Sequence, residues 1–164
     1  MFKTRKQLAA AAALVACLSS GAPAALAQDH HSHHAKESAQ LTLNNGKKWT
    51  TDDNLRQAMS RIQDALTAEL PAIHSDKASA EQYQALAKKV NGQVEFMVQN
   101  CKLDKDADAM LHLVIAEIIA GADAMSDQKN NQTRRHGAEK IVSALESYGA
   151  YFEHPGWHEV KHAH

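Results

Sequence analysis

Eight of the eleven histidines in this chain lie in two short segments near its ends. The two groups are His30, His31, His33 and His34, and His154, His158, His162 and His164. Neutral imidazole is a common ligand for copper, zinc and nickel. Histidine clusters at chain ends therefore predict contact with a transition metal, although the same composition also occurs in ends that are only solvated and pH-sensitive.

The first 27 residues have the pattern of a bacterial secretory signal peptide. Three basic residues precede the apolar stretch Leu8–Leu18, and Ala25-Leu26-Ala27 forms a small-residue cleavage site. We therefore expect export to the periplasm, with a mature chain that begins at Gln28. An alternative is Leu14-Val15-Ala16-Cys17, which resembles the cleavage box of bacterial lipoproteins and would leave Cys17 lipidated and the protein anchored to a membrane.

The chain that would remain after cleavage is acidic. Residues 1–27 contain three basic and no acidic residues, so the other 137 have 15 Lys and Arg against 19 Asp and Glu, a formal charge of −4 with neutral His. This balance argues against a nucleic-acid partner, which needs a basic surface. No later stretch reaches the roughly 18 uncharged apolar residues of a membrane helix. Cys101 would be the only cysteine, so no internal disulfide is expected.

About 137 residues make one domain. Residues 28–50 are predicted to form a polar, His-rich lead-in and a short flap, in which Asn45-Gly46 marks a turn and Trp49 packs on the fold. Residues 51–154 form the folded core, and residues 155–164 form a His-rich tail.

Four helices are predicted in the core. Apolar residues recur at spacings of three and four over about 51–73, 79–101, 106–125 and 133–152. Thr51 or Asp52 is expected to cap the first helix, Pro71 to break or kink its end, and Ser79-x-x-Gln82 to form a capping box at the second. Because the links are short, we predict an all-α, up-down-up-down four-helix bundle.

Antiparallel order would bring sulfur and imidazole ligands together at one pole of this bundle. There Cys101 ends the second helix, His112 lies near the start of the third and His154 follows the fourth. Methionines at the same pole are Met59, Met97 and Met110. Thiolate, thioether and imidazole suit copper, especially Cu(I). The alternatives are ordinary ones: methionines as core filler, a buried inert thiol, and a histidine that caps a helix.

Motifs of the common enzyme classes are missing from the sequence. It contains no Ser-centred elbow, Gly-rich phosphate loop, Cys-x-x-Cys or His-Glu-x-x-His. We therefore expect a protein that is not an enzyme. Arg134, Arg135 and His136 open the fourth helix and are expected to be solvated, since a helix start disfavours cations.

Three stretches resemble a family of small exported proteobacterial helical proteins, sometimes labelled DnrO-like. They are Asn100-Cys101-Lys102-Leu103, Ala107–His112 and the segment from Tyr148-Gly149 to His154-Pro155-Gly156-Trp157. The Gly46–Trp49 segment also matches a Gly-Lys-Lys-Trp-like pattern of these proteins. The resemblance covers about residues 43–157 and implies export and a helical fold; no biochemical activity comes with it.

A weaker likeness is to soluble cytochrome b562, a periplasmic four-helix bundle that holds haem b between a Met and a His. Met59 and His154 would take these roles, and Ala150-Tyr151 precedes His154 as a similar pair does in that family. Two additional residues and Pro155 depart from its pattern. The functions left open are transition-metal binding, haem-based electron transfer, and a metal-free envelope protein that binds a protein partner.

Overall fold

A computed structural model describes residues 40–128 and 130–160 of the chain, all in one structural unit. Several predicted features lie outside the described residues. They are the signal peptide over residues 1–27, Cys17, the four N-terminal histidines, His162 and His164.

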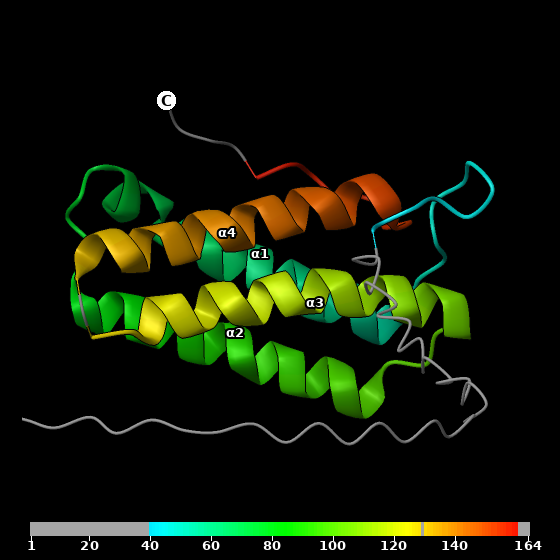
Figure 1. Cartoon of the computed structure of the whole chain (residues 1–164), viewed down its shortest axis with the longest axis horizontal. Helices are drawn as coiled ribbons and strands as arrows, with labels where there is room; N and C mark the ends of the chain where they lie inside the picture. The colour runs from blue at the N-terminus through cyan, green and yellow to red at the C-terminus, as the bar shows by residue number, and fades with distance from the viewer. Residues whose placement is uncertain (1–39, 129, 161–164) are drawn as a thin grey trace, which may run out of the picture. The chain divides into compact units, whose positions relative to one another are not determined.

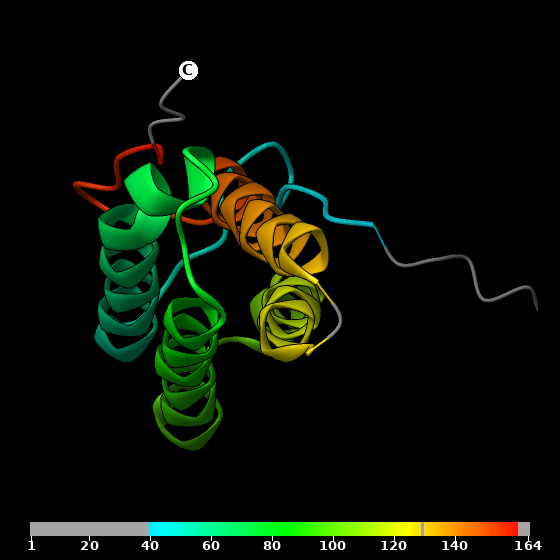
Figure 2. The same cartoon turned by 90° about the vertical axis from the view of Figure 1, so that its left-hand side faces the viewer.

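The described residues form the predicted all-α four-helix bundle. Its helices are α1 (Asp53–His74), α2 (Ala80–Asn100), α3 (Lys105–Ser126) and α4 (Asn131–Tyr151). Successive helices run in opposite directions, and the view along them shows the four at the corners of a square (Figures 1 and 2). Each predicted boundary lies within a few residues of the observed one.

Side chains cap the first two helices as the sequence predicts. Asp52 accepts a hydrogen bond from the Leu55 N–H at the start of α1, and Ser79 and Gln82 form a reciprocal capping box on α2. Pro71 was expected to break or kink the end of α1; the helix continues past it to His74, close to the predicted end at residue 73. One proline near a helix end removes a single backbone hydrogen bond, and the Ser75 hydroxyl donates to the Pro71 carbonyl (2.8 Å) to close the last turn.

Helices α3 and α4 approach closely where two glycines face each other. A Cβ at Gly137 would lie 2.5 Å from the Gly121 carbonyl oxygen, and one at Gly121 would lie 2.6 Å from the Gly137 carbonyl oxygen. Larger residues have no space at either position. This pairing makes α3·α4 the tightest helix pair of the bundle.

The flap before α1 also forms as predicted. Asn45 and Gly46 both have positive φ, as a two-residue hairpin turn requires, and Asn44 and Lys47 exchange two backbone hydrogen bonds. Trp49 then pairs with the chain beyond α4, since its N–H donates to the Tyr151 carbonyl and its carbonyl accepts from the Glu153 N–H (both 2.8 Å). The flap and the end of α4 are therefore fixed to each other.

After α4 the chain turns back over the bundle. Pro155 and Gly156, the latter with a φ of +81°, form a turn closed by a hydrogen bond from the Trp157 N–H to the His154 carbonyl (3.0 Å). Residues 153–160, here called the C-terminal strap, then cross α1 and α4 (red in Figure 2). The Gln63 side chain on α1 donates to the His158 carbonyl, and Val160 is buried.

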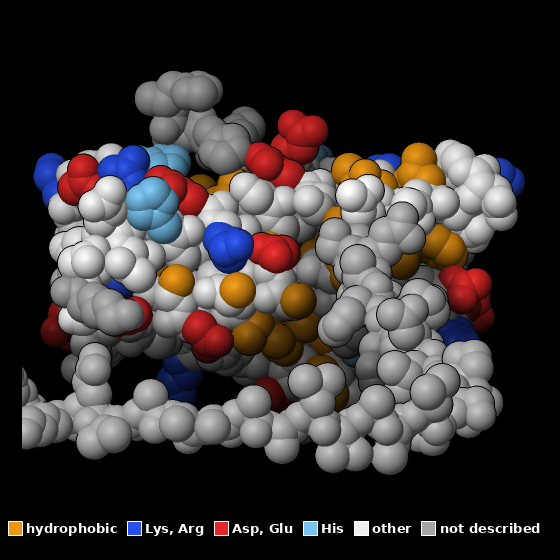
Figure 3. Space-filling view, viewed as in Figure 1, with side chains coloured by type: hydrophobic (Ala, Val, Ile, Leu, Met, Phe, Trp, Pro, Cys, Tyr) orange, Lys and Arg blue, Asp and Glu red, His pale blue; other side chains and the backbone are white. Residues whose placement is uncertain are grey.

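The core lies between the four helices, and its outer faces differ in character. On the side seen in Figure 3, apolar side chains gather over α3 and charged ones over α4. Among the described residues, α3 is also long and apolar enough to suit a membrane span by composition; here Leu111, Val114 and Ile118 bury one face of it in the bundle.

The prediction for Arg134 is wrong. Its side chain was expected to be solvated, but the residue is only 7% exposed. One guanidinium nitrogen donates to the Asn131 side chain (2.9 Å), while Nε is buried without a hydrogen-bond partner. The neighbouring Arg135 and His136 are exposed or half-buried and pair with carboxylates, as expected of surface residues.

Candidate functional site

The start of α1, the end of α2, the start of α3 and the end of α4 meet at one end of the bundle, on the right of Figure 1. We call this end the Cys101 pole. It is the pole at which the sequence places the sulfur and imidazole residues. Its detailed geometry decides which of them are available to a ligand.

Asp52 is the residue around which this pole is organised. One carboxylate oxygen accepts from the Leu55 N–H (2.7 Å) and caps α1, and the other accepts from the Lys102 N–H (2.6 Å) in the link between α2 and α3. Burial first, and then the charge of Asp52 and its hydrogen bond to the thiol, together raise the pKa of the neighbouring Cys101 thiol to about 12. The half-buried thiol therefore stays protonated at neutral pH, whereas metal binding and nucleophilic attack require the thiolate.

His154 is the best-defined histidine of the pole. Its Nδ1 is hydrogen-bonded to the Tyr148 hydroxyl (3.0 Å), and its Nε2 lies 3.4 Å from the Ser60 hydroxyl on α1. Burial lowers the pKa of His154, and the nearby Arg56 cation lowers it further. The imidazole is thus favoured in its neutral form, with both ring nitrogens in contact with hydroxyl groups.

Tyr148 contacts His154 and two aromatic side chains at this pole. Its fully buried ring stacks on Phe152 (5.3 Å between centroids) and meets the Trp157 ring edge-on at 4.9 Å. Burial raises the pKa of Tyr148, and the nearby Cys101 and Asp52 contribute in the same direction, against an opposing effect of Arg56. Tyr148 therefore remains a neutral phenol with Cys101 and His154 both close to it.

His112 points away from this arrangement. Its side chain is 67% exposed, and its Nδ1 lies 2.8 Å from the carbonyl oxygen of Asp108, one turn earlier on α3. The methionines are placed differently again. Met59 and Met97 are buried in the core, and half-buried Met110 accepts a hydrogen bond from the Thr42 hydroxyl (3.7 Å).

Within residues 40–128 and 130–160, no three His, Cys, Asp or Glu side chains are grouped so that they could hold a metal ion. His154 is hydrogen-bonded to Tyr148, whereas the His112 side chain is exposed. The proposed Cys101/His112/His154 metal site remains a prediction, and it would require side chains to leave the contacts described above.

Haem binding by Met59 and His154 would also require side chains to leave their present contacts. Met59 has no exposed surface, and both ring nitrogens of His154 are in contact with hydroxyl groups. An iron between these two residues would have to displace Tyr148 or Ser60 and open the core. No feature of the described residues favours haem binding.

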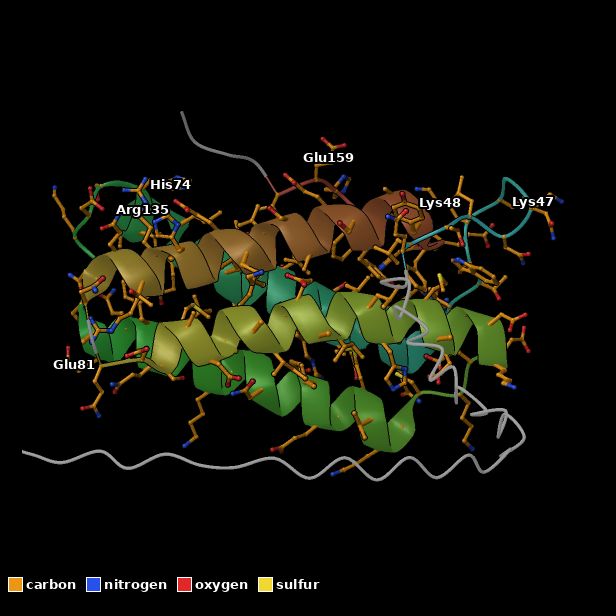
Figure 4. All side chains as sticks on the ribbon, in the orientation of Figure 1. Lys47, Lys48, His74, Glu81, Arg135 and Glu159 are labelled. Carbon is orange, nitrogen blue, oxygen red and sulfur yellow. The ribbon has the colours of Figure 1, made fainter. Side chains whose placement is uncertain are left out.

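A pocket beside the Cys101 pole was not predicted from the sequence. A cavity of about 330 Å³ lies against the last turns of α4 at Glu146 and Gly149, with Lys48 from the flap and Trp157 and Glu159 from the C-terminal strap around it. Lys48 and Glu159 lie on the same side of α4 (Figure 4). Lys48 lies 101 positions from Gly149 in the sequence, and the pocket forms only because the flap and the strap both fold onto α4. The one sequence signal was the unusual cluster of aromatic residues between positions 148 and 157.

Comparison of the chain with models of protein families, with curated proteins and with solved structures finds no match in any of the three. The resemblances noted in the sequence therefore stay predictions. What the chain does has to be inferred from its own residues.

Proposed function

We propose that this is an exported periplasmic protein that binds a transition metal, copper foremost, through its His-rich ends, in metal homeostasis or resistance. The observation that carries the proposal is the distribution of histidine: eight of eleven lie in the two terminal segments. The signal-peptide pattern over residues 1–27 supports export.

The bundle geometry favours the terminal histidines over the pole as the metal ligands. At the pole the Cys101 thiol is held protonated, with its pKa raised to about 12, and Met59 and Met97 are buried. In the C-terminal strap, by contrast, the His158 side chain is exposed, and His162 and His164 follow it closely in the sequence. The buried Val160 attaches this His-rich end to the bundle.

The candidate metals can be ranked by their affinity for the ligand types that the His-rich ends provide. A site made of imidazoles, without thiolate, suits Cu(II), Zn(II) and Ni(II), and the general affinity order for nitrogen ligands places Cu(II) highest. Zinc and nickel are the secondary candidates at the ends of the chain. Cu(I), which prefers sulfur ligands, would need the protonated thiol and the buried thioethers of the pole.

Metal titration of matched histidine variants tests this proposal. One variant of the mature chain changes the four N-terminal histidines together with His158, His162 and His164 to Asn; the control changes His112 and His136, the two exposed histidines of the helices, to Asn. We expect Cu(II) affinity, measured by competition with a chelator, to fall at least about 100-fold in the first variant and to be unchanged in the control. Retained affinity in the first variant would reject the proposal.

A further inference from the structure

The pocket beside α4 has a composition that suits a particular kind of ligand. Two of its lining residues are aromatic: Phe152, which is buried, and Trp157, whose ring packs against that of Tyr148. Its rim carries the carboxylates of Glu146 and Glu159 and the ammonium of Lys48. The volume of about 330 Å³ lies at the lower end of the range for small-molecule sites, about 300–1,000 Å³.

Gly149 allows the Trp157 ring to lie against α4 and line this pocket. A Cβ at position 149 would lie 2.5 Å from the Trp157 Nε1 and 2.7 Å from its Cδ1. Only glycine permits the indole to lie so close to the helix backbone. The ring is further held by edge-on contact with Tyr148 and by His154, whose ring centroid is 4.9 Å away. Trp157 is thus a fixed wall of the pocket.

The charges around the pocket favour a cation. The pocket is lined by two carboxylates and one ammonium, and the Lys48 ammonium donates to the Gly149 carbonyl oxygen (2.5 Å). An indole face attracts cations through its quadrupole, and nearby carboxylates add to this attraction. A ligand with a positive charge and an apolar body would satisfy both features of the pocket.

The geometry points to a binding site for a small organic cation, an ammonium group on an aromatic or aliphatic body, in the pocket formed by Lys48, Glu146, Gly149, Trp157 and Glu159. The pocket includes Trp157 and Glu159 of the C-terminal segment that also carries His158, but its proposed ligand is an organic cation and not a metal ion. It requires no metal ion.

Three probes with the same phenyl body and different charges test the proposal. Phenethylamine is a cation, phenylalanine a zwitterion and 3-phenylpropionate an anion. Each is titrated into the metal-free mature protein in the presence of a chelator, and the indole N–H signal of Trp157 is followed by NMR, with Trp49, which does not line the pocket, as the internal reference. We expect phenethylamine to shift the Trp157 signal saturably and to bind more tightly than the other two. Equal binding of the three probes, preference for the anion, or no saturable shift at Trp157 would overturn the proposal.

A pair of exposed glutamates supplies the matched variants. Glu159→Gln should weaken phenethylamine binding about three- to fivefold, the effect of one exposed ion pair. Glu95→Gln removes another exposed carboxylate, which lies on α2 outside this pocket, and should leave binding unchanged. Both positions are exposed, so neither change is expected to disturb the fold. Equal effects of the two changes would show that only overall charge matters and would refute the site.

Discussion

The Tyr148 hydroxyl and the Nδ1 of His154 are hydrogen-bonded at 3.0 Å, although α4 ends between the two residues. The contact exists because the chain leaves α4 at Phe152 and turns at Pro155-Gly156, which places the imidazole over the preceding helical turn. Flap, helix end and C-terminal strap all meet at this contact. It turns the end of the helix into a defined structure from which the strap returns across α1 and α4.

Protonation of His154 should lower the stability of the folded protein as the pH falls. Burial, aided by Arg56, lowers the folded-state pKa of His154 below its usual value near 6.5. The unfolded chain therefore binds more protons than the folded one as the pH drops below about 6.5. The contribution of His154 to the free energy of unfolding is fully present above that pH and is lost as the pH falls towards the folded-state pKa. Urea unfolding of the wild type and of His154→Gln at pH 7.5 and 5.5 should show a smaller pH dependence in the variant.

His136→Gln is the matched control for this experiment, because His136 is exposed at the opposite end of α4 and its side chain is 65% accessible. The control should keep the pH dependence of the wild type. An unchanged pH dependence in His154→Gln would mean that other groups cause the loss of stability in acid.

Cys101 should react slowly with thiol reagents. With a pKa of about 12, the thiolate fraction at pH 8 is about 1000-fold lower than for a free cysteine, and the labelling rate should fall accordingly. Asp52→Asn removes the charge that helps to hold the proton and should accelerate labelling and shift its pH profile downwards. Asp53→Asn, which changes a carboxylate whose side chain is 97% exposed, should have no such effect. A wild-type rate within tenfold of a free thiol would contradict this account of the pole.

The glycine contact between α3 and α4 gives a test of the packing. Gly137→Ala would place a methyl group 2.5 Å from the Gly121 carbonyl oxygen and 2.8 Å from the Met125 nitrogen, so we expect a loss of about 1–3 kcal/mol of stability. Gly92→Ala makes the same change in α2, where no atom lies within 4 Å of the new Cβ. It should stabilise the protein by about 0.5–1 kcal/mol, because alanine favours helix. If thermal unfolding shows the same decrease in Tm for both variants, the close approach of α3 and α4 at Gly137 is contradicted.

Much of the fold could be predicted from the sequence because local signals determine it. The apolar spacing indicates the helices, Asp52 and Ser79 mark helix starts, and Asn45-Gly46 requires a turn of a known type. Pro71 does not end α1, because a proline near a helix end removes only one backbone hydrogen bond, and the helix continues to His74. The prediction that Arg134 is solvated failed because a position at the start of a helix does not indicate which residues cover the side chain.

The site was harder to predict, because helix order brings residues to the same pole without fixing the direction of their side chains. His154 is hydrogen-bonded to Tyr148, whereas His112 bonds to its own helix and points to solvent. The pocket against α4 depends on where the flap and the strap fold back, which no local pattern specifies. The role of Gly149 is visible only once Trp157 lies against it.

The most direct test of the central claim is the metal content of the protein isolated from the native periplasm. Elemental analysis of the wild type should find roughly one or more transition-metal ions per chain, chiefly copper, and should find almost none in the variant that lacks the four N-terminal histidines, His158, His162 and His164. Wild-type protein without bound metal, or a variant that retains the full amount, would contradict metal binding by the His-rich ends.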